Sequence, residues 1–116
     1  MMSATILRQQ KLYGLFELDE SGVVLYYRVE PTEGPSGPSP IITGRNFFNE
    51  IAPFENVDEF RLRLAQFIRG VQQADIFNFT CQLDHGPVFV KVLLARVRER
   101  SNGERTKSIL VHIRKA

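Results

Sequence analysis

The stretch GRNFFNEIAPF, residues 44–54, decides how the rest of the chain is interpreted. It places four large apolar side chains and a proline within eleven residues, namely Phe47, Phe48, Ile51, Phe54 and Pro53. Their spacing fits neither the two-residue period of a strand nor the 3.6-residue period of a long helix. So much hydrophobic surface in an irregular segment has two interpretations. It is the wall of an interior pocket, or it is a plug that covers the core and binds nothing.

A helix is predicted directly after this stretch. Asn56 and Glu59 stand three residues apart, the spacing of a capping box, in which each side chain accepts a hydrogen bond from a backbone N–H near the other residue. Apolar residues then recur at the spacing of an amphipathic helix with one buried face, which we expect to end near residues 70–74. They are Val57, Phe60, Leu64, Phe67, Ile68 and Val71, whereas Arg61, Arg63, Gln66 and Arg69 lie mostly off this stripe.

The residues before the stretch predict a hairpin and a long loop. Residues 13–18 and 23–29 are apolar runs rich in aromatic and β-branched side chains, and the turn residues DESG separate them. Residues 30–40, EPTEGPSGPSP, hold four prolines and two glycines, so they form neither a helix nor a central strand. We expect a loop within one domain, because the sequence before it is too short to fold alone.

The last third of the chain is strand-like. Residues 76–83, 88–97 and 108–114 carry the strand patterns, and Asn102-Gly103 predicts a tight hairpin between the last two. Two strands, a helical middle and three strands favour the α+β class, with one antiparallel sheet covered by helices on one face. We expect residues 13–116 to form this domain and residues 1–12 to be a short helix or a disordered N-terminal segment.

Length, charge and cysteine content bound the function. The 116 residues suit one domain, and a formal net charge of +2 is too small to imply nucleic acid by itself. Cys81 is the only cysteine, so an intrachain disulfide is impossible and a reducing, cytoplasmic compartment is expected. Residues 1–10 lack the apolar core of a secretion signal, and no run approaches the ~20 apolar residues of a membrane span.

The order of elements resembles that of PAS domains. Within it, Asn46-Phe47-Phe48 followed by Ile51-Ala52-Pro53 resembles the segment that leads to the chromophore cysteine in the photoactive yellow protein family. Tyr27 falls, without a gap, at the spacing of that family's chromophore-contacting tyrosine. The resemblance covers roughly residues 13–114 and implies a PAS fold, with a five-stranded antiparallel sheet and helices on one face.

The chain departs from the family at the chromophore attachment site. In the family the Ala-Pro pair is followed by a cysteine whose thiolate holds a 4-hydroxycinnamoyl group as a thioester, and here that position is Phe54. Phenylalanine has no nucleophile. Cys81 lies 27 residues further on, in the middle of a predicted strand, so it cannot easily take over.

The hydrogen-bond network around the chromophore also departs. Counted without gaps from Tyr27, the family's glutamate, threonine and arginine become Pro31, Pro35 and Gly37. A buried phenolate is costly unless donors satisfy it. A shifted alignment with Glu30 or Glu33 would restore one carboxylate but not the cysteine.

These departures lead to a functional hypothesis. We expect a non-photoactive PAS sensory or protein-interaction domain in signal transduction, with a filled or apolar core pocket, no catalytic activity and no cofactor. Phe54 is expected to point its ring into the volume that a chromophore would fill. The pocket candidates are Tyr27, Phe47, Phe48, Phe54 and Phe67.

The outer face of the sheet is the expected partner surface. Residues 88–97 are apolar on both faces of the strand, although a half-solvated sheet is normally polar on its outer side. Either a protein partner or a second copy of the chain docks there, or the N-terminal segment folds over it. The candidates are Val92, Leu94, Leu110 and His112, with their faces dependent on a one-residue register.

Two other functions stay open. A sensor that binds a small apolar or aromatic ligand non-covalently would need a cavity of about 300 Å³ or more lined by the aromatic candidates. A weaker alternative is a nucleic-acid module, disfavoured because no aromatics clearly interleave with the basic residues. Those are Arg96, Arg98, Arg100, Arg105, Lys107, Arg114 and Lys115. With one cysteine, the separated His85 and His112 give no metal-ligand spacing, so we expect no metal.

Overall fold

The computed structural model describes residues 13–29, 41–52, 54–84, 86–98 and 106–116. The predictions for residues 1–12, for the loop 30–40, for His85 and for the hairpin at 101–104 lie outside these ranges. The elements are β1 (Gly14–Leu18), β2 (Val24–Val29), the π-helical turn η2 (Phe47–Ile51), α1 (Val57–Arg69), β3 (Ala74–Leu83), β4 (Gly86–Arg98) and β5 (Thr106–Lys115).

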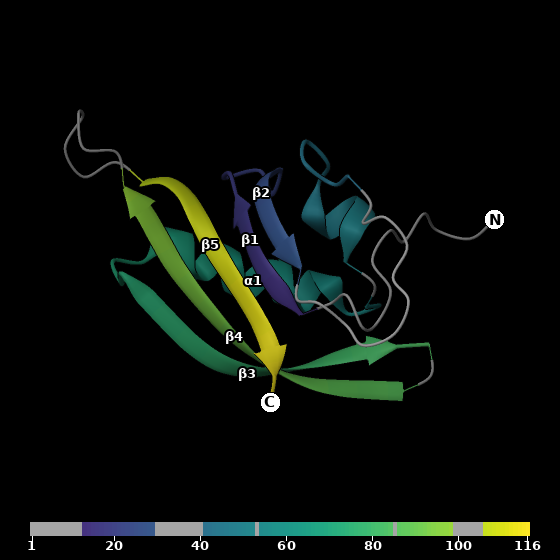
Figure 1. Cartoon of the computed structure of the whole chain (residues 1–116). Helices are drawn as coiled ribbons and strands as arrows, with labels where there is room; N and C mark the ends of the chain where they lie inside the picture. Colours follow the sequence, from purple (N-terminus) through teal and green to yellow (C-terminus); the bar gives the residue numbers. More distant parts are fainter. Residues whose placement is uncertain (1–12, 30–40, 53, 85, 99–105) are drawn as a thin grey trace.

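The strands form one antiparallel sheet in the order β2-β1-β5-β4-β3 (Figure 1). β1 and β5 come from opposite ends of the chain and lie side by side at the centre, where Phe16 pairs with Val111. With the helical segments between β2 and β3, this arrangement confirms the predicted α+β PAS-like fold. All five strands overlap the runs that the sequence pattern predicted.

The two faces of the sheet differ in what covers them. In Figure 1, α1 lies behind the sheet and the opposite face points toward the viewer. We call the helix-covered side the inner face and the other side the outer face. Phe60, Leu64 and Phe67 of α1 are buried together with inner-face residues such as Phe16 and Val111, and this layer is the hydrophobic core.

The prediction that Val92 and Leu94 lie on the outer face is wrong. Val92 pairs with Ile113 and Leu94 pairs with Val111, and all four side chains are buried in the core. Directly paired residues point to the same side of a sheet, so a shift of one residue reverses every assignment on a strand. The outer-face positions of β4 are therefore the odd-numbered ones, such as Leu93.

The β1–β2 turn is held by its first residue. The Asp19 side chain accepts hydrogen bonds from the backbone N–H groups of Ser21 and Val23, both at 2.9 Å. Gly22 adopts a φ of 90°, which an L-residue with a side chain rarely tolerates. The hairpin predicted from DESG is thereby confirmed.

The start of α1 corrects the capping-box prediction. Asn56 precedes the helix, but its side chain makes no capping hydrogen bond. Its amide instead donates to the Thr80 carbonyl at 2.8 Å and accepts from the Gln82 N–H at 2.9 Å. Val71, placed on the helical stripe by its spacing, lies beyond the end of the helix and is 89% exposed. Local spacing could not reveal that Asn56 bonds to a distant strand.

The other end of α1 is fastened to the sheet by Arg96 of β4. Its guanidinium lies over the Phe67 ring, 4.7 Å from the ring centroid. A cation at the carbonyl end of a helix is favourable. The same group donates hydrogen bonds to the backbone carbonyls of Phe67, Ile68, Gly70 and Gln72.

Candidate functional site

The segment that follows the loop, η2, is one π-helical turn. The Asn46 side chain accepts hydrogen bonds from the backbone N–H groups of Phe48 and Asn49 at 3.0 and 3.1 Å. In return, the Glu50 carboxylate accepts from the Asn46 N–H at 3.0 Å. This reciprocal cap explains how a segment without helical periodicity keeps a defined shape. It leaves Phe47, Phe48 and Ile51 buried.

Two contacts hold η2 against the β1–β2 turn. The Asn46 amide donates to the Ser21 carbonyl at 2.9 Å, and the Phe47 N–H donates to the Gly22 carbonyl at 2.8 Å. A Cβ atom at Gly22 would lie 2.7 Å from two carbon atoms of the Phe48 ring. The turn therefore needs glycine for two reasons, its positive φ and the closeness of this ring.

Phe54 lies inside the core. Its side chain is 3% exposed, and its ring meets the rings of Phe60 and Phe79 edge-on, with centroids 5.8 and 6.0 Å apart. Phe60 in turn meets Phe79 at 5.3 Å, so the three rings form one packed group between η2, α1 and β3. Such edge-to-face geometry is the preferred arrangement of aromatic rings.

The structure divides the five predicted pocket residues. Phe47, Phe54 and Phe67 are buried in the core, and Tyr27 is half-buried and packed against it. Phe48 is also buried, but its ring lines a surface pocket. The candidates thus share one apolar core, and only Phe48 faces the pocket described next.

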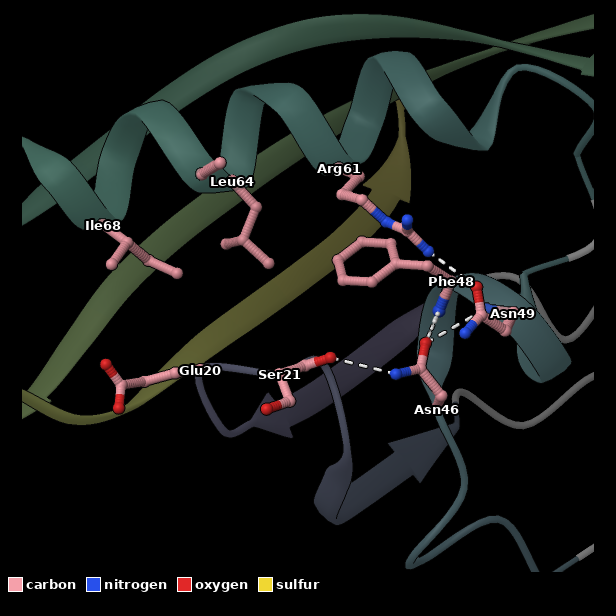
Figure 2. Close-up of a pocket in the computed structure, with 9 residues that line it drawn as sticks. Glu20, Ser21, Asn46, Phe48, Asn49, Arg61, Leu64 and Ile68 are labelled. Atoms are coloured by element: carbon pink, nitrogen blue, oxygen red, sulfur yellow. Dashed lines mark hydrogen bonds between the residues drawn. The ribbon is translucent and has the colours of Figure 1, made fainter.

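That pocket lies between α1, η2 and the β1–β2 turn and has a volume of about 350 Å³ (Figure 2). Leu64, Ala65 and Ile68 of α1 form one wall, and Glu20 and Ser21 of the turn form the facing wall. Phe48, Asn46, Asn49 and Arg61 complete its lining. The pocket therefore combines an apolar wall with several polar groups at its rim.

Arg61 and Glu20 bring charge to this pocket. The Arg61 guanidinium donates to the Asn49 side chain at 2.6 Å and lies 5.1 Å from the centroid of the Phe48 ring. Glu20 is exposed on the turn, across the pocket from the helix. Sequence reasoning missed both residues: the pattern placed Arg61 off the buried stripe and Glu20 in a turn, and neither position signals a pocket by itself.

Several kinds of polar group line this pocket. Among the described residues that line it, a carboxylate, a hydroxyl and a guanidinium are present, with no histidine or cysteine. Burial also raises the pKa of the Cys81 thiol to about 12. The reactive thiolate is therefore disfavoured near neutral pH.

Of the predicted partner-face residues, Leu110 and His112 lie on the outer face. Leu110 pairs with Glu17 and His112 pairs with Leu15, and all four are half-buried.

Within the described ranges, no three metal-ligating side chains come together. The helix that these ranges contain is too short and too polar to cross a bilayer.

Comparison with known proteins found two relatives. The photoactive yellow protein of Halochromatium salexigens is 33% identical over 84 residues, which cover 72% of this chain and 66% of that protein. The photoactive yellow protein of Rhodothalassium salexigens is 32% identical over 87 residues, covering 72% of this chain and 67% of that protein. The match therefore spans about two thirds of the length of each relative. No protein-family model matches the chain.

Proposed function

Because the chain belongs to the photoactive yellow protein family, we propose that it is a non-photoactive PAS domain that senses or binds a protein partner in signal transduction. Its core pocket is filled by its own side chains. The proposed function involves no catalysis and no cofactor, and its proposed location is the cytoplasm. Docking takes place through the outer face of the sheet, on a protein partner or a second copy.

The burial of Phe54 carries this proposal. In the resemblance on which this proposal rests, Phe54 takes the position of the chromophore-bearing cysteine, and its ring packs against Phe60 and Phe79. A phenylalanine side chain buries about 150–250 Å² of surface, so it occupies volume that a bound aromatic group would otherwise fill.

The remaining thiol and the loop composition support the same conclusion. Cys81 is buried and its pKa is raised to about 12, so it is a poor nucleophile for forming a thioester. The gapless count from Tyr27 puts Pro31, Pro35 and Gly37 where the family has polar partners of the chromophore. Proline and glycine side chains donate no hydrogen bonds.

The test is treatment of the purified chain with activated 4-hydroxycinnamic acid. We expect no visible absorption band that survives denaturation, and a mass equal to that of the untreated chain. The variant Phe54→Cys, treated in parallel, is the matched control, because it restores a thiol at the position in question and shows that the reagent reaches it. A denaturation-resistant coloured adduct on the wild-type chain would refute the proposal.

A second candidate function is the sensing of a small ligand, and the 350 Å³ pocket favours it. Its volume lies within the range of known ligand sites. A ligand present at 100 times its Kd would stabilise the fold by about 2.7 kcal/mol. Free 4-hydroxycinnamate and phenol are suitable first probes in a thermal-shift assay, with Ser21→Trp as a variant that fills the pocket. If neither probe raises the Tm of the wild type more than it raises the Tm of Ser21→Trp, these aromatic compounds are not ligands of the pocket.

A further inference from the structure

The outer face of the sheet combines exposed apolar side chains with basic ones. Ile76 and Phe89 are 64% and 62% exposed there, and Leu93, the partner of Ile76 on β4, is half-buried. Strand register aligns one row across the sheet. From β2 to β3 it reads Arg28, Leu15, His112, Leu93 and Ile76. Exposed apolar residues grouped on one face indicate a site of protein–protein interaction.

A pair of like charges lies beside this row. Lys91 of β4 and Arg114 of β5 are directly paired across the two strands, so their side chains leave the sheet on the same side. Like charges placed directly opposite each other destabilise a sheet. A depression of about 150 Å³ lies at this point, lined by Ile76, Lys91, Leu93, His112 and Arg114.

Acidic groups on the described part of this face do not compensate the basic ones. Arg28 adds a third positive charge at the β2 end of the row. The outer-face acid on β1, Glu17, accepts a hydrogen bond from the Ser108 hydroxyl at 2.5 Å and supplies one negative charge against the three positive ones. Among the described residues, the face therefore offers apolar surface next to an excess of positive charge.

We propose that this face binds an acidic amphipathic segment of another protein, whose carboxylates pair with Lys91 and Arg114 and whose apolar side chains cover Leu93 and Ile76. The inference rests on the proposed function, since it names the chemistry of the partner. Complementary charge steers association and selects partners. The partner's carboxylates also relieve the repulsion between the paired Lys91 and Arg114.

Charge also argues against two occupants that the sequence suggested, a second copy of the chain and residues 1–12. A second copy docked through the same face would bring its own Lys91 and Arg114 to this face, because a two-fold interface joins identical patches. Residues 1–12 contain Arg8 and Lys11 and no aspartate or glutamate. Either occupant would add positive charge to a face that is already positive.

The test measures binding of two labelled helical peptides to the full chain by fluorescence anisotropy. The peptides have the same leucine stripe and differ only in carrying glutamate or lysine beside it. We expect the glutamate peptide to bind and the lysine peptide to bind at least about tenfold more weakly. Lys91→Glu should weaken the glutamate peptide about tenfold, which equals about 1.4 kcal/mol. Arg69→Glu is the matched control, because it makes the same charge change at an exposed position on α1.

Each other outcome overturns the inference. Equal binding of both peptides, or an equal effect of Lys91→Glu and Arg69→Glu, would show that the face does not select acidic partners. Absence of binding by either peptide would show that the face does not bind an acidic amphipathic segment. A dimer in native mass spectrometry that Lys91→Glu stabilises would assign it to a second copy. None of these results depends on whether the chain reacts with activated 4-hydroxycinnamic acid. A failure of this inference is therefore distinguishable from a failure of the proposed function.

Discussion

Replacing Phe54 with alanine is the most direct test of a filled core. The ring is 3% exposed and lies 5.8 and 6.0 Å from the centroids of Phe60 and Phe79, so truncation removes both contacts and leaves a cavity. Phenylalanine-to-alanine changes in cores cost about 3–5 kcal/mol. Since small domains have a stability of only about 5–15 kcal/mol, this loss is a large fraction of the total.

Urea denaturation and thermal melting measure this loss. We expect the free energy of unfolding to fall by about 3–5 kcal/mol and the Tm by about 10–25 °C. The control is Phe89→Ala, which removes the same atoms from a ring that is 62% exposed. It should change stability by no more than about 0.5–1 kcal/mol.

The cavity left by Phe54→Ala gives a second readout. Apolar cavities in proteins stay dry and bind small aromatic molecules. Benzene should therefore raise the Tm of Phe54→Ala more than it raises the Tm of the wild type. A loss of stability below about 1 kcal/mol would refute the reasoning, because it would mean that the ring makes no substantial packing contribution.

Three further changes test other features. Gly22→Ala should lower the free energy of unfolding by about 2–4 kcal/mol, because it combines a positive φ with a Cβ placed 2.7 Å from the Phe48 ring. Gly44→Ala has a similar φ and no atom within 4 Å, so it should cost only about 1–2 kcal/mol in the same urea titration. Arg96→Met should lower the free energy of unfolding by about 2–3 kcal/mol, because it removes charged hydrogen bonds to the end of α1. Proteolysis near residues 70–73 should accelerate, and an unchanged cleavage rate would contradict the role of Arg96 in fastening α1 to the sheet. The pKa of Cys81 is raised from 9.0 to about 12 on folding, so its contribution to stability is full below about pH 9 and is lost as the pH rises toward about 12. Cys81→Ala should therefore show a shallower loss of stability over that range, and parallel curves for the two proteins would exclude this linkage.

Local patterns were enough to predict the strands and the α-helix of this fold. Alternation and turn residues located all five strands within a few residues, and the apolar spacing located α1. The π-helical turn was visible only as a failure of both periodicities. Asn46 and Glu50, four residues apart around Phe47 and Phe48, form a reciprocal cap that the sequence analysis did not identify.

What sequence could not supply was the choice between faces and the long-range partners of polar side chains. Val92 and Leu94 were placed outside because β4 is apolar on both sides, and only its pairing with β5 settles which side meets α1. Arg96 was grouped with the basic residues of the C-terminal third, although its guanidinium is used within the fold. Arg61 lines a pocket because η2 lies next to α1, a juxtaposition that spacing along one helix does not encode.

The two outermost strands each carry a backbone segment that is not itself a strand. Beside β2, Val24 accepts a hydrogen bond from the Gly44 N–H at 2.8 Å and donates to the Arg45 carbonyl at 2.9 Å. Beside β3, Gln82 accepts from the Glu55 N–H at 2.7 Å and donates to the Asn56 side chain at 2.9 Å. These positions cannot template an incoming strand, which is how unprotected sheets polymerise into fibrils. At these positions, backbone segments protect the sheet against edge-to-edge aggregation in place of the charged side chains that other proteins use.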